Sequence, residues 1–539
     1  MQFQLADLYE CLCDAGPEAP AVIAGDRRVS RAALEARANR LAHHLLRHGV
    51  AAGDHVGIYS MNRVEWVEAL LACWKIRAAA VNVNYRYVTD ELRYIWDNSD
   101  LVALVYERGF SERVRALAEE FPGVRTYLAL EDGSDAPPGP GRAYEAALAA
   151  QCDARDFAPR SGDDIYLVYT GGTTGMPKGV LWRHEDLYSN VIGSLLGTVD
   201  APEAIAKQAD NPLGMRTLTL SPLMHGGGQF PFLITVLNGG VGLFPVSRRF
   251  DPDEVLGIVE RERVTTLSII GDAMGRPLAE AKLGGNYDTR SLQAISTGGA
   301  ILTDPVRRLL RQAFGKVYLT GGIGSSEIGS AAKETRTFDA RSGPRFRLDP
   351  GVAVLDEDLE PIAPGSDRIG RLARSGNIPL GYYKDPEKTA DTFVTDARGV
   401  RWVLPGDYAR VEADGTITLL GRGSQCINSG GEKVFPDEVE SVLVRHPAVR
   451  HAAVVGVPDP RWQQRVVALV ELEAAERRLD LEALQDHCRR HLAGYKVPRA
   501  LLLTELQRTP TGKLDIAWAM KYAEQALGRA DGPEAEEAQ

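Results

Sequence analysis

A segment rich in glycine and threonine, residues 165–182, carries the residue types that bind phosphate groups. It reads IYLVYTGGTTGMPKGVLW, so an apolar run leads into Thr170 and Lys178 follows the glycines. Glycines let backbone N–H groups turn toward an anion, hydroxyls donate to phosphate oxygens, and the lysine adds positive charge. A Walker loop needs glycine directly before the lysine and Ser or Thr directly after it, whereas this chain has Pro177 and Gly179. Because apolar residues follow, we expect the loop to join two strands rather than to open a helix.

The string from Thr170 to Gly179 resembles the phosphate-loop motif of the adenylate-forming superfamily, which includes acyl-CoA synthetases, aryl-CoA ligases, peptide-synthetase adenylation domains and luciferases. One departure is Gly172, where serine is more usual. Six further segments resemble motifs of that family in the same order, so the resemblance covers nearly the whole chain. The strings TGGTTGMPKGVLWR, PLMHGGGQ, IGSSE, IPLGYYKDPEKTADTF and GRGSQCINSGGEKVFP are similar to the branch that acts on long-chain, branched or steroid-type polycyclic acids.

The resemblance implies a site for ATP. Glu327 would bind Mg²⁺, and Ser326 would lie near the α-phosphate. A single carboxylate is adequate because phosphate oxygens also bind the ion. Asp407 would accept hydrogen bonds from the ribose hydroxyls, since a carboxylate accepts two donors at once. Ile323 stands where the family usually has an aromatic residue that stacks on adenine. The residues implied for ATP or AMP binding are Thr170, Gly171, Gly172, Thr173, Thr174, Lys178, Gly298, Gly299, Ala300, Gly322, Ile323, Gly324, Ser325, Asp407 and Arg422.

The resemblance also implies sites for the acid and for coenzyme A. His225, in the string SPLMHGGG, would gate the carboxylate of the acid, and Gly226, Gly227 and Gly298 would line the acyl pocket. The glycine run 226–228 leaves room that fits a bulky apolar acid. The pantetheine arm of coenzyme A would enter along Gly430, Gly431, Glu432 and Lys433.

Lys513, in the hexapeptide RTPTGK, resembles the C-terminal lysine motif of the family. It would bridge the acyl and α-phosphate oxygens as negative charge moves toward pyrophosphate. Ser424 matches the hinge position, where the family usually carries Asp or Lys, and a small residue can still absorb a backbone rotation there. The implied catalytic residues are Lys513, Glu327, Ser326 and His225.

Helices and short apolar strands must position these groups. Residues 30–48 predict a capped amphipathic helix, with strands at 55–60 and 79–83 and a helix at 63–75. This alternation, which recurs over 216–319, is typical of an α/β layered domain with a largely parallel sheet. From about residue 421 the pattern changes. The remaining predicted elements are a helix at 436–445, strands at 449–457, 466–472 and 501–506, and a helix at 481–492, which together form a small α+β unit.

The predicted fold class is therefore α/β, with a large multi-layer N-terminal domain and a small α+β C-terminal domain joined by a hinge. We place the AMP-binding domain at residues 1–423, the mobile C-terminal domain at 424–525 and an acidic, disordered tail at 526–539. The length of 539 residues agrees with more than one domain, because single hydrophobic cores stop growing near about 250–300 residues.

Composition excludes several classes of protein. The formal net charge of −11 argues against a nucleic-acid partner, since such proteins carry a basic surplus. The N-terminal residues show no signal peptide, and the most apolar stretch, 231–246, is too short and interrupted to span a bilayer. We therefore expect no integral membrane contact. The six cysteines show neither disulfide nor zinc spacing, so we expect free buried thiols in a reducing cytoplasm.

Three functions stay open. The first is a complete acid–CoA ligase that uses ATP, Mg²⁺ and coenzyme A to convert a carboxylic acid through an acyl-adenylate. The second performs only the thioester step on a preformed acyl-adenylate, as Ile323, Ser424 and the stretch 514–517 suggest. The third is a non-enzymatic nucleotide-binding protein, which the joint presence of Lys513, Glu327 and Asp407 disfavours. A carrier-protein acceptor and a homo-oligomer are also possible.

Overall fold

The computed structural model describes residues 3–170, 176–298, 300, 302–339, 343–429, 432–459, 462–473, 476, 478–509 and 513–530. Several predicted site residues lie outside the described residues: Gly171, Gly172, Thr173, Thr174, Gly299, Gly430 and Gly431. The larger part of the predicted tail, residues 531–539, also lies outside them.

A parallel sheet with strand order β4-β3-β5-β6-β7 forms the first layer of the large domain. Its strands are β3 (His55–Tyr59), β4 (Ala79–Asn82), β5 (Leu101–Glu107), β6 (Thr126–Leu130) and β7 (Arg142–Ala143). The helices of this region are α1 (Leu5–Ala15), α2 (Arg31–Arg47), α3 (Val64–Lys75), α4 (Thr89–Asn98), α5 (Ser111–Ala118) and α6 (Tyr144–Ala149). Helix α2 begins as predicted, because the Ser30 hydroxyl accepts a hydrogen bond from the Ala33 N–H at 3.2 Å and so caps the first turn.

A second, long sheet begins with parallel strands in the order β1-β11-β10-β12-β13-β14. The strands are β1 (Pro20–Ala24), with the antiparallel β2 (Arg27–Ser30) at its edge, β10 (Arg216–Thr219), β11 (Val241–Phe244), β12 (Thr266–Ile269), β13 (Ala294–Thr297) and β14 (Tyr318–Ser325). The helices between them are α7 (His184–Asn190), α8 (Gly226–Val236), α9 (Pro252–Glu262), α10 (Gly271–Gly284) and α11 (Asp304–Phe314). This alternation over 216–319 was predicted.

From β14 onward the same sheet is antiparallel, which the sequence analysis did not predict. It continues in the order β14-β15-β16-β23-β22-β18-β21-β20, and β17 pairs with β18. Its strands are β15 (Gly329–Asp339), β16 (Gly343–Leu348), β17 (Val352–Leu355), β18 (Ile369–Ser375), β20 (Phe393–Thr395), β21 (Arg401–Val403), β22 (Asp407–Val411) and β23 (Ile417–Arg422), and the helix α12 (Pro386–Thr392) directly precedes β20. The expectation of a largely parallel sheet therefore holds only for the first part of the domain.

The strands on either side of the phosphate loop pair with each other as a hairpin. Strand β8 (Ile165–Thr170) pairs antiparallel with β9 (Lys178–Arg183), and β19 (Gly381–Tyr382) adds to the other edge of β9. The loop thus joins two strands, as the apolar residues after Gly179 predicted.

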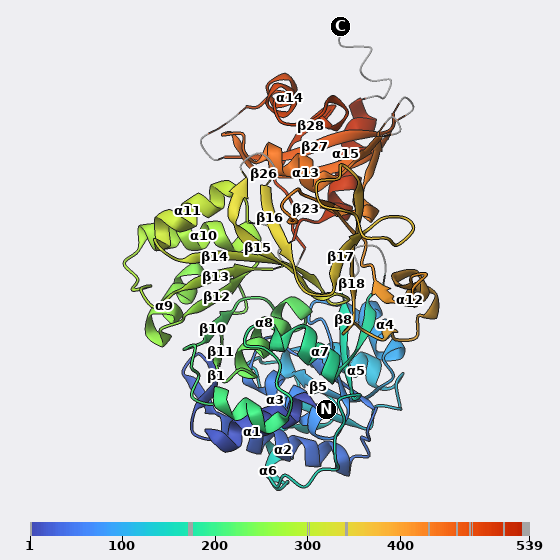
Figure 1. Ribbon diagram of the computed structural model, residues 1–539. Coiled ribbons are helices and arrows are strands. Elements are labelled where there is room, and N and C mark those ends of the chain that lie inside the picture. Colours follow the sequence, from blue (N-terminus) through green and yellow to red (C-terminus); the bar gives the residue numbers. More distant parts are fainter. Residues whose placement is uncertain are drawn as a thin grey trace.

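The C-terminal domain is a small α+β unit that packs on the large domain beside β23 and the helix α10 (Figure 1). Its sheet runs β25-β24-β27-β26, with β28 parallel to β27. The elements are β24 (Ile427–Ser429), β25 (Glu432–Val434), β26 (Val449–Asp459), β27 (Gln463–Leu472), β28 (Ala500–Leu503), α13 (Pro436–Leu443), α14 (Leu481–Arg489) and α15 (Ile516–Ala530). Arg276 of α10 pairs with Glu473 at 3.1 Å across the domain boundary. Because α15 ends at Ala530, the predicted start of the tail at residue 526 lies inside a helix.

The helices and the cysteines of this fold bear on two of the predictions made from composition. None of the helices within the described ranges is long and apolar enough to cross a membrane. Cys13, Cys73 and Cys488 are buried, as predicted, but Cys152 is exposed. The prediction of a buried thiol is therefore wrong at that position, which lies in an irregular segment after α6.

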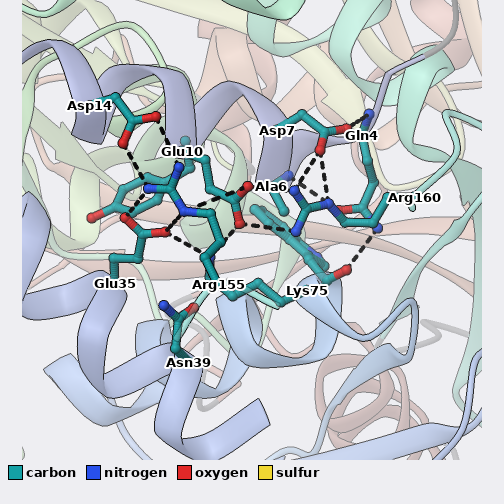
Figure 2. A network of polar contacts seen from close by, with 12 residues as sticks. Gln4, Ala6, Asp7, Glu10, Asp14, Glu35, Asn39, Lys75, Arg155 and Arg160 are labelled. Atoms are coloured by element: carbon teal, nitrogen blue, oxygen red, sulfur yellow. Dashed lines mark hydrogen bonds and ion pairs between the residues drawn. The ribbon is translucent and has the colours of Figure 1, made fainter. Parts of the chain in front are cut away.

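A buried polar network joins the first three helices to the segment that leads into β8 (Figure 2). The ammonium group of Lys75, which is 1% exposed, donates to Glu10 and, at 3.0 Å, to Glu35. Arg155 donates to Glu35 at 2.7 Å, and Arg160 donates to Glu10 at 2.9 Å. Burial raises the pKa of Glu35, but Arg155 and Lys75 outweigh this effect and leave the pKa below its usual value. The network holds residues 155–160 in place, and these residues lead into the hairpin formed by β8 and β9.

We expect Lys75→Met to lower the free energy of unfolding by about 3 kcal/mol, because it leaves two buried carboxylates short of a cation. The measurement is urea unfolding at pH 7. Since the folded state lowers the pKa of Glu35, the network stabilises at pH values above the ordinary glutamate pKa and weakens as pH falls below it. The Lys75→Met difference should therefore shrink in acid. The matched control is Lys316→Met at an exposed position, and an equal loss in both variants would contradict the prediction.

Candidate active site

The two ends of the phosphate loop lie side by side in the β8–β9 hairpin, where Thr170 pairs with Lys178. The Lys178 ammonium forms an ion pair with Asp385 at 2.7 Å and lies 5.6 Å from the centroid of the Tyr382 ring. Asp385 is itself fixed, because its side chain caps α12 by accepting the Lys388 N–H. An incoming phosphate group would therefore compete with Asp385 for the lysine.

Two hydroxyl groups orient the Glu327 carboxylate. Ser325 donates to one oxygen at 2.8 Å, and Tyr382 donates to the other at 3.2 Å. Each oxygen keeps a free lone pair, and Mg²⁺ prefers such carboxylate ligands. Among the described residues, no group of three or more His, Cys, Asp or Glu side chains could hold a metal ion by itself. Glu327 thus fits an ion that takes its other ligands from phosphate oxygens and water.

His225 is the N-cap of α8, and the glycine run forms the first turn of that helix. A Cβ atom at Gly226 would lie 3.1 Å from the Ser326 hydroxyl, and one at Gly228 would clash with the Pro222 carbonyl oxygen at 2.2 Å. At Gly227 a Cβ atom would meet nothing within 4 Å. The expectation that the whole run leaves room is therefore wrong for Gly226 and Gly228, which are small because other groups approach them closely. It holds for Gly227.

The imidazole of His225 is neutral and has an unused nitrogen. Burial lowers the pKa of His225 to about 4, with further contributions from the positive charges of Lys513 and Arg86. Its Nε2 atom is buried and has no hydrogen-bond partner in the described part of the chain. Leaving such an atom unpaired costs about 1–3 kcal/mol. This nitrogen is therefore available to a group of a ligand.

Asp407 and Arg422 lie on the paired strands β22 and β23, directly opposite each other. The Arg422 Nε atom donates to the Asp407 carboxylate at 3.3 Å. Burial raises the pKa of Asp407, while Arg422 and Lys513 oppose the rise and the negative charge of Glu327 adds to it. A carboxylate in these surroundings is stabilised by hydrogen-bond donors, and the hydroxyls of a ribose are such donors.

Lys513 reaches this cluster from the C-terminal domain. Burial and the charge of Arg422 lower the pKa of Lys513, whereas Asp407 and Glu327 act in the opposite direction. Lys513 nevertheless remains partly exposed to solvent. The structure thus brings Lys513, Glu327, Asp407 and Arg422 together, although they come from different elements.

Of the residues predicted to pack on adenine, Gly298 and Ala300 lie in the loop that follows β13, and Ile323 lies on β14. Ile323 is 9% exposed and packs in a hydrophobic cluster with Phe346 and other side chains of the antiparallel sheet, so only a small face remains for a ligand. Its neighbours Gly322 and Gly324 are exposed. A Cβ atom at Gly298 would meet nothing within 4 Å. The Ala300 carbonyl accepts the Thr297 hydroxyl at 2.9 Å, which shapes the loop.

The predicted coenzyme A strip and hinge lie at the start of the C-terminal domain. Glu432 and Lys433 belong to β25, which pairs with β24. Ser424 belongs to a short 3-10 turn, Gly423–Gln425, that follows β23 directly. These positions suit a connection between the domains, and the roles of the residues stay predictions.

Comparison with known proteins identifies the family. Residues 12–383 match the protein family described as "AMP-binding enzyme". Residues 438–513 match the family described as "AMP-binding enzyme C-terminal domain". The chain belongs to the AMP-binding enzyme family. This AMP-binding enzyme is 45% identical to a 3-oxocholest-4-en-26-oate–CoA ligase from Rhodococcus rhodochrous, over 99% of each chain. It is also 45% identical to a medium/long-chain-fatty-acid–CoA/3-oxocholest-4-en-26-oate–CoA ligase from Mycobacterium tuberculosis, over 96% of each chain.

Among solved structures, the fold of the AMP-binding enzyme is similar to that of the anthranilate CoA ligase AuaEII in complex with anthranoyl-AMP. The TM-score is 0.83, with 23% identity over 98% of each chain. The predicted fold class and resemblance are therefore confirmed, as is the prediction of an acid–CoA ligase that uses ATP and coenzyme A. The non-enzymatic alternative is excluded.

Four side chains that shape this site were not predicted from the sequence. Tyr382 and Asp385 lie in a string that was recognised, GYYKDPE, but neither was singled out. Trp182 follows the phosphate loop and donates from its indole to the Ser326 carbonyl oxygen at 2.8 Å. Arg86 contributes positive charge near His225. For Tyr382, Asp385 and Trp182 the signal was their position in or beside a recognised motif, whereas Arg86 lies in no such motif.

Proposed function

We propose that the enzyme activates a bulky apolar carboxylic acid, of long-chain, branched or steroid-type polycyclic structure, and transfers it to coenzyme A. The relatives named for 3-oxocholest-4-en-26-oate and for medium- and long-chain fatty acids support this substrate class. The open space beside Gly227 and Gly298 agrees with it. A cytoplasmic location and the domain boundary after residue 423 stay predictions.

The position of Lys513 carries the assignment of the first half-reaction. An oxygen of the acid carboxylate attacks the α-phosphorus of ATP, a new P–O bond forms, and the bond to pyrophosphate breaks. Such a reaction needs positioning and charge neutralisation rather than covalent help. Lys513 lies among Glu327, Asp407 and Arg422, so its ammonium can neutralise charge on the acyl and α-phosphate oxygens.

The other residues take roles that their contacts support. Lys178 would leave Asp385 for the β- and γ-phosphates, and Asp407 would accept the ribose hydroxyls beside Arg422. Glu327, oriented by Ser325, would hold Mg²⁺, which when bound neutralises phosphate charge. The neutral His225 would meet the carboxylate of the acid with its unpaired nitrogen.

In the second half-reaction the thiol of coenzyme A attacks the carbonyl carbon of the acyl-adenylate, a C–S bond forms, and AMP leaves. Lys513 has no role in this step. We propose that the C-terminal domain rotates about Ser424, withdraws Lys513 and presents the strip that includes Glu432 and Lys433. Domain closure of this kind is common among enzymes.

A specialised enzyme that performs only the thioester step remains the alternative. Ile323, which is almost buried, and the hinge residue Ser424 motivate it. The location of Lys513 next to Glu327 and Asp407 favours the complete ligase, because only the adenylation step uses that arrangement.

The test is a panel of acids that runs from acetate through fatty acids to a steroid side-chain acid. Pyrophosphate release and thioester formation are measured separately. We expect both products, with kcat/KM for the long or polycyclic acids at least about 100-fold above that for acetate, because each buried methylene contributes roughly tenfold or more. Thioester from supplied acyl-adenylate without acid-dependent ATP–pyrophosphate exchange would establish the alternative. A preference for short acids would refute the proposed substrate class.

A further inference from the structure

Asn82 ends β4, a strand of the first sheet, and is 5% exposed. Its amide makes hydrogen bonds to two other segments. It donates to the Tyr169 carbonyl at 2.9 Å and to the Met224 carbonyl at 2.5 Å, and its oxygen accepts the Tyr169 N–H at 2.8 Å. A buried amide with these partners holds three backbone groups in place.

The bonds to Tyr169 fix the base of the phosphate loop. Tyr169 directly precedes Thr170, and β8 lies at the end of the strand order β19-β9-β8. Within the described residues no strand pairs with the other edge of β8. The Asn82 amide binds both the N–H and the C=O of Tyr169, as a neighbouring strand would. It therefore sets the direction in which the chain enters the phosphate loop.

The bond to Met224 holds the loop of residues 221–225, the acyl-gate loop, in place. Met224 directly precedes His225, the N-cap of α8. The same loop is also held by Asn62, which donates to the Ser221 carbonyl at 3.1 Å and accepts the Leu223 N–H at 2.7 Å. Among the described residues, Asn62 forms hydrogen bonds with the loop before His225, whereas Asn82 forms them with both that loop and Tyr169.

We propose that Asn82 is a positioning residue that couples the phosphate loop to the acyl gate, so that ATP and the acid strengthen each other's binding through its amide. The inference rests on the proposed function, because that function assigns the two loops to ATP and to the acid. Coupling between two sites is reciprocal and typically amounts to roughly 5–150-fold in affinity. A displacement of either loop by about 1 Å can lower the rate about 100-fold.

The experiment measures binding of a long-chain or steroid acid with and without α,β-methylene-ATP, which cannot be cleaved to pyrophosphate. In the wild-type enzyme we expect the nucleotide to tighten acid binding at least about fivefold. In Asn82→Leu the factor should fall below about twofold, and kcat/KM for pyrophosphate release should fall about 100-fold, with KM raised for both substrates. Asn62→Leu should raise KM for the acid and leave KM for ATP unchanged.

Asn238 supplies the matched control for loss of stability. It is a buried asparagine that donates to two backbone carbonyls, of Ile192 and Ile234, at 3.1 and 2.7 Å. Asn238→Leu should lower the melting temperature and leave both KM values and the coupling factor unchanged. Should Asn82→Leu fail to fold, Asn82→Asp carries the same test, since it keeps the size and the acceptor oxygen but loses both donor bonds.

Two results would overturn the inference: no coupling in the wild-type enzyme, or an equal coupling factor in the wild-type enzyme and the Asn82 variants. Neither result affects the proposed function, whose own failure would appear as wild-type enzyme that releases no pyrophosphate with any acid of the panel. The two failures are therefore distinguishable.

Discussion

Lys513→Ala is expected to lower acid-dependent pyrophosphate release by about 10²–10³-fold, because one preorganised charge at the reacting oxygens contributes that much. The ammonium lies among Glu327, Asp407 and Arg422 and reaches them from the C-terminal domain. The same variant should convert supplied acyl-adenylate and coenzyme A to thioester within about threefold of the wild-type rate, since the lysine has no role once the anhydride exists. The measurement is the two half-reactions assayed side by side.

The control for this prediction is Lys521→Ala, which removes an exposed lysine from α15 in the same domain and should change neither half-reaction. Pyrophosphate release that is unchanged in Lys513→Ala would refute the catalytic role. An equal loss in both half-reactions would instead show that the lysine supports the structure of the domain. The comparison thus separates chemistry at the α-phosphate from domain stability.

Much of the first domain could be predicted from sequence because its signals are local. The Ser30 cap, the strand His55–Tyr59 and the hairpin at the phosphate loop each depend on residues close in the chain. The antiparallel part of the second sheet has no such signal. Strand β16 pairs with β23 through Arg345 and Thr418, and pairing across so long a separation leaves little trace in either segment.

The site shows the same division between local and distant signals. The resemblance of the segments around Lys513, Glu327 and Asp407 to one family predicts that these residues act at one site, and in the folded chain the charges of Glu327 and Asp407 act on Lys513. The ion pair of Lys178 with Asp385 joins residues far apart in the sequence, and no pattern in either segment predicts it. Only the folded chain shows that the lysine already has a carboxylate partner, with which the phosphates of ATP would compete under the proposed function.

The glycine run after His225 shows why residue type alone misleads. Small residues were interpreted as space for the acid, but Gly228 is small because the Pro222 carbonyl would lie 2.2 Å from a Cβ atom. A glycine that leaves room and a glycine that permits close backbone contact look identical in a sequence. The distances separate them, and they leave Gly227 as the position that borders open space.

Glu327→Gln is expected to lower pyrophosphate release by about 100-fold at saturating ATP, because the amide keeps the size of the side chain but removes its negative charge. The concentration of free Mg²⁺ that gives half-maximal rate should rise at least about tenfold, since a neutral amide oxygen is a weaker ligand for a hard cation. The measurement is a Mg²⁺ titration of pyrophosphate release. Glu357→Gln at an exposed position is the control, and an unchanged Mg²⁺ dependence in Glu327→Gln would refute the assignment.

The two hydroxyls that orient Glu327 extend this prediction to a second variant. Tyr382 donates to one carboxylate oxygen at 3.2 Å and Ser325 to the other at 2.8 Å. Tyr382→Phe leaves the charge and one of the two bonds, so its effect on the Mg²⁺ requirement should be smaller than that of Glu327→Gln. If Tyr382 acts through Glu327, adding Tyr382→Phe to Glu327→Gln should change the Mg²⁺ requirement less than Tyr382→Phe does alone. Additive effects would mean that Tyr382 acts instead through its other neighbour, the Lys178 ammonium above its ring.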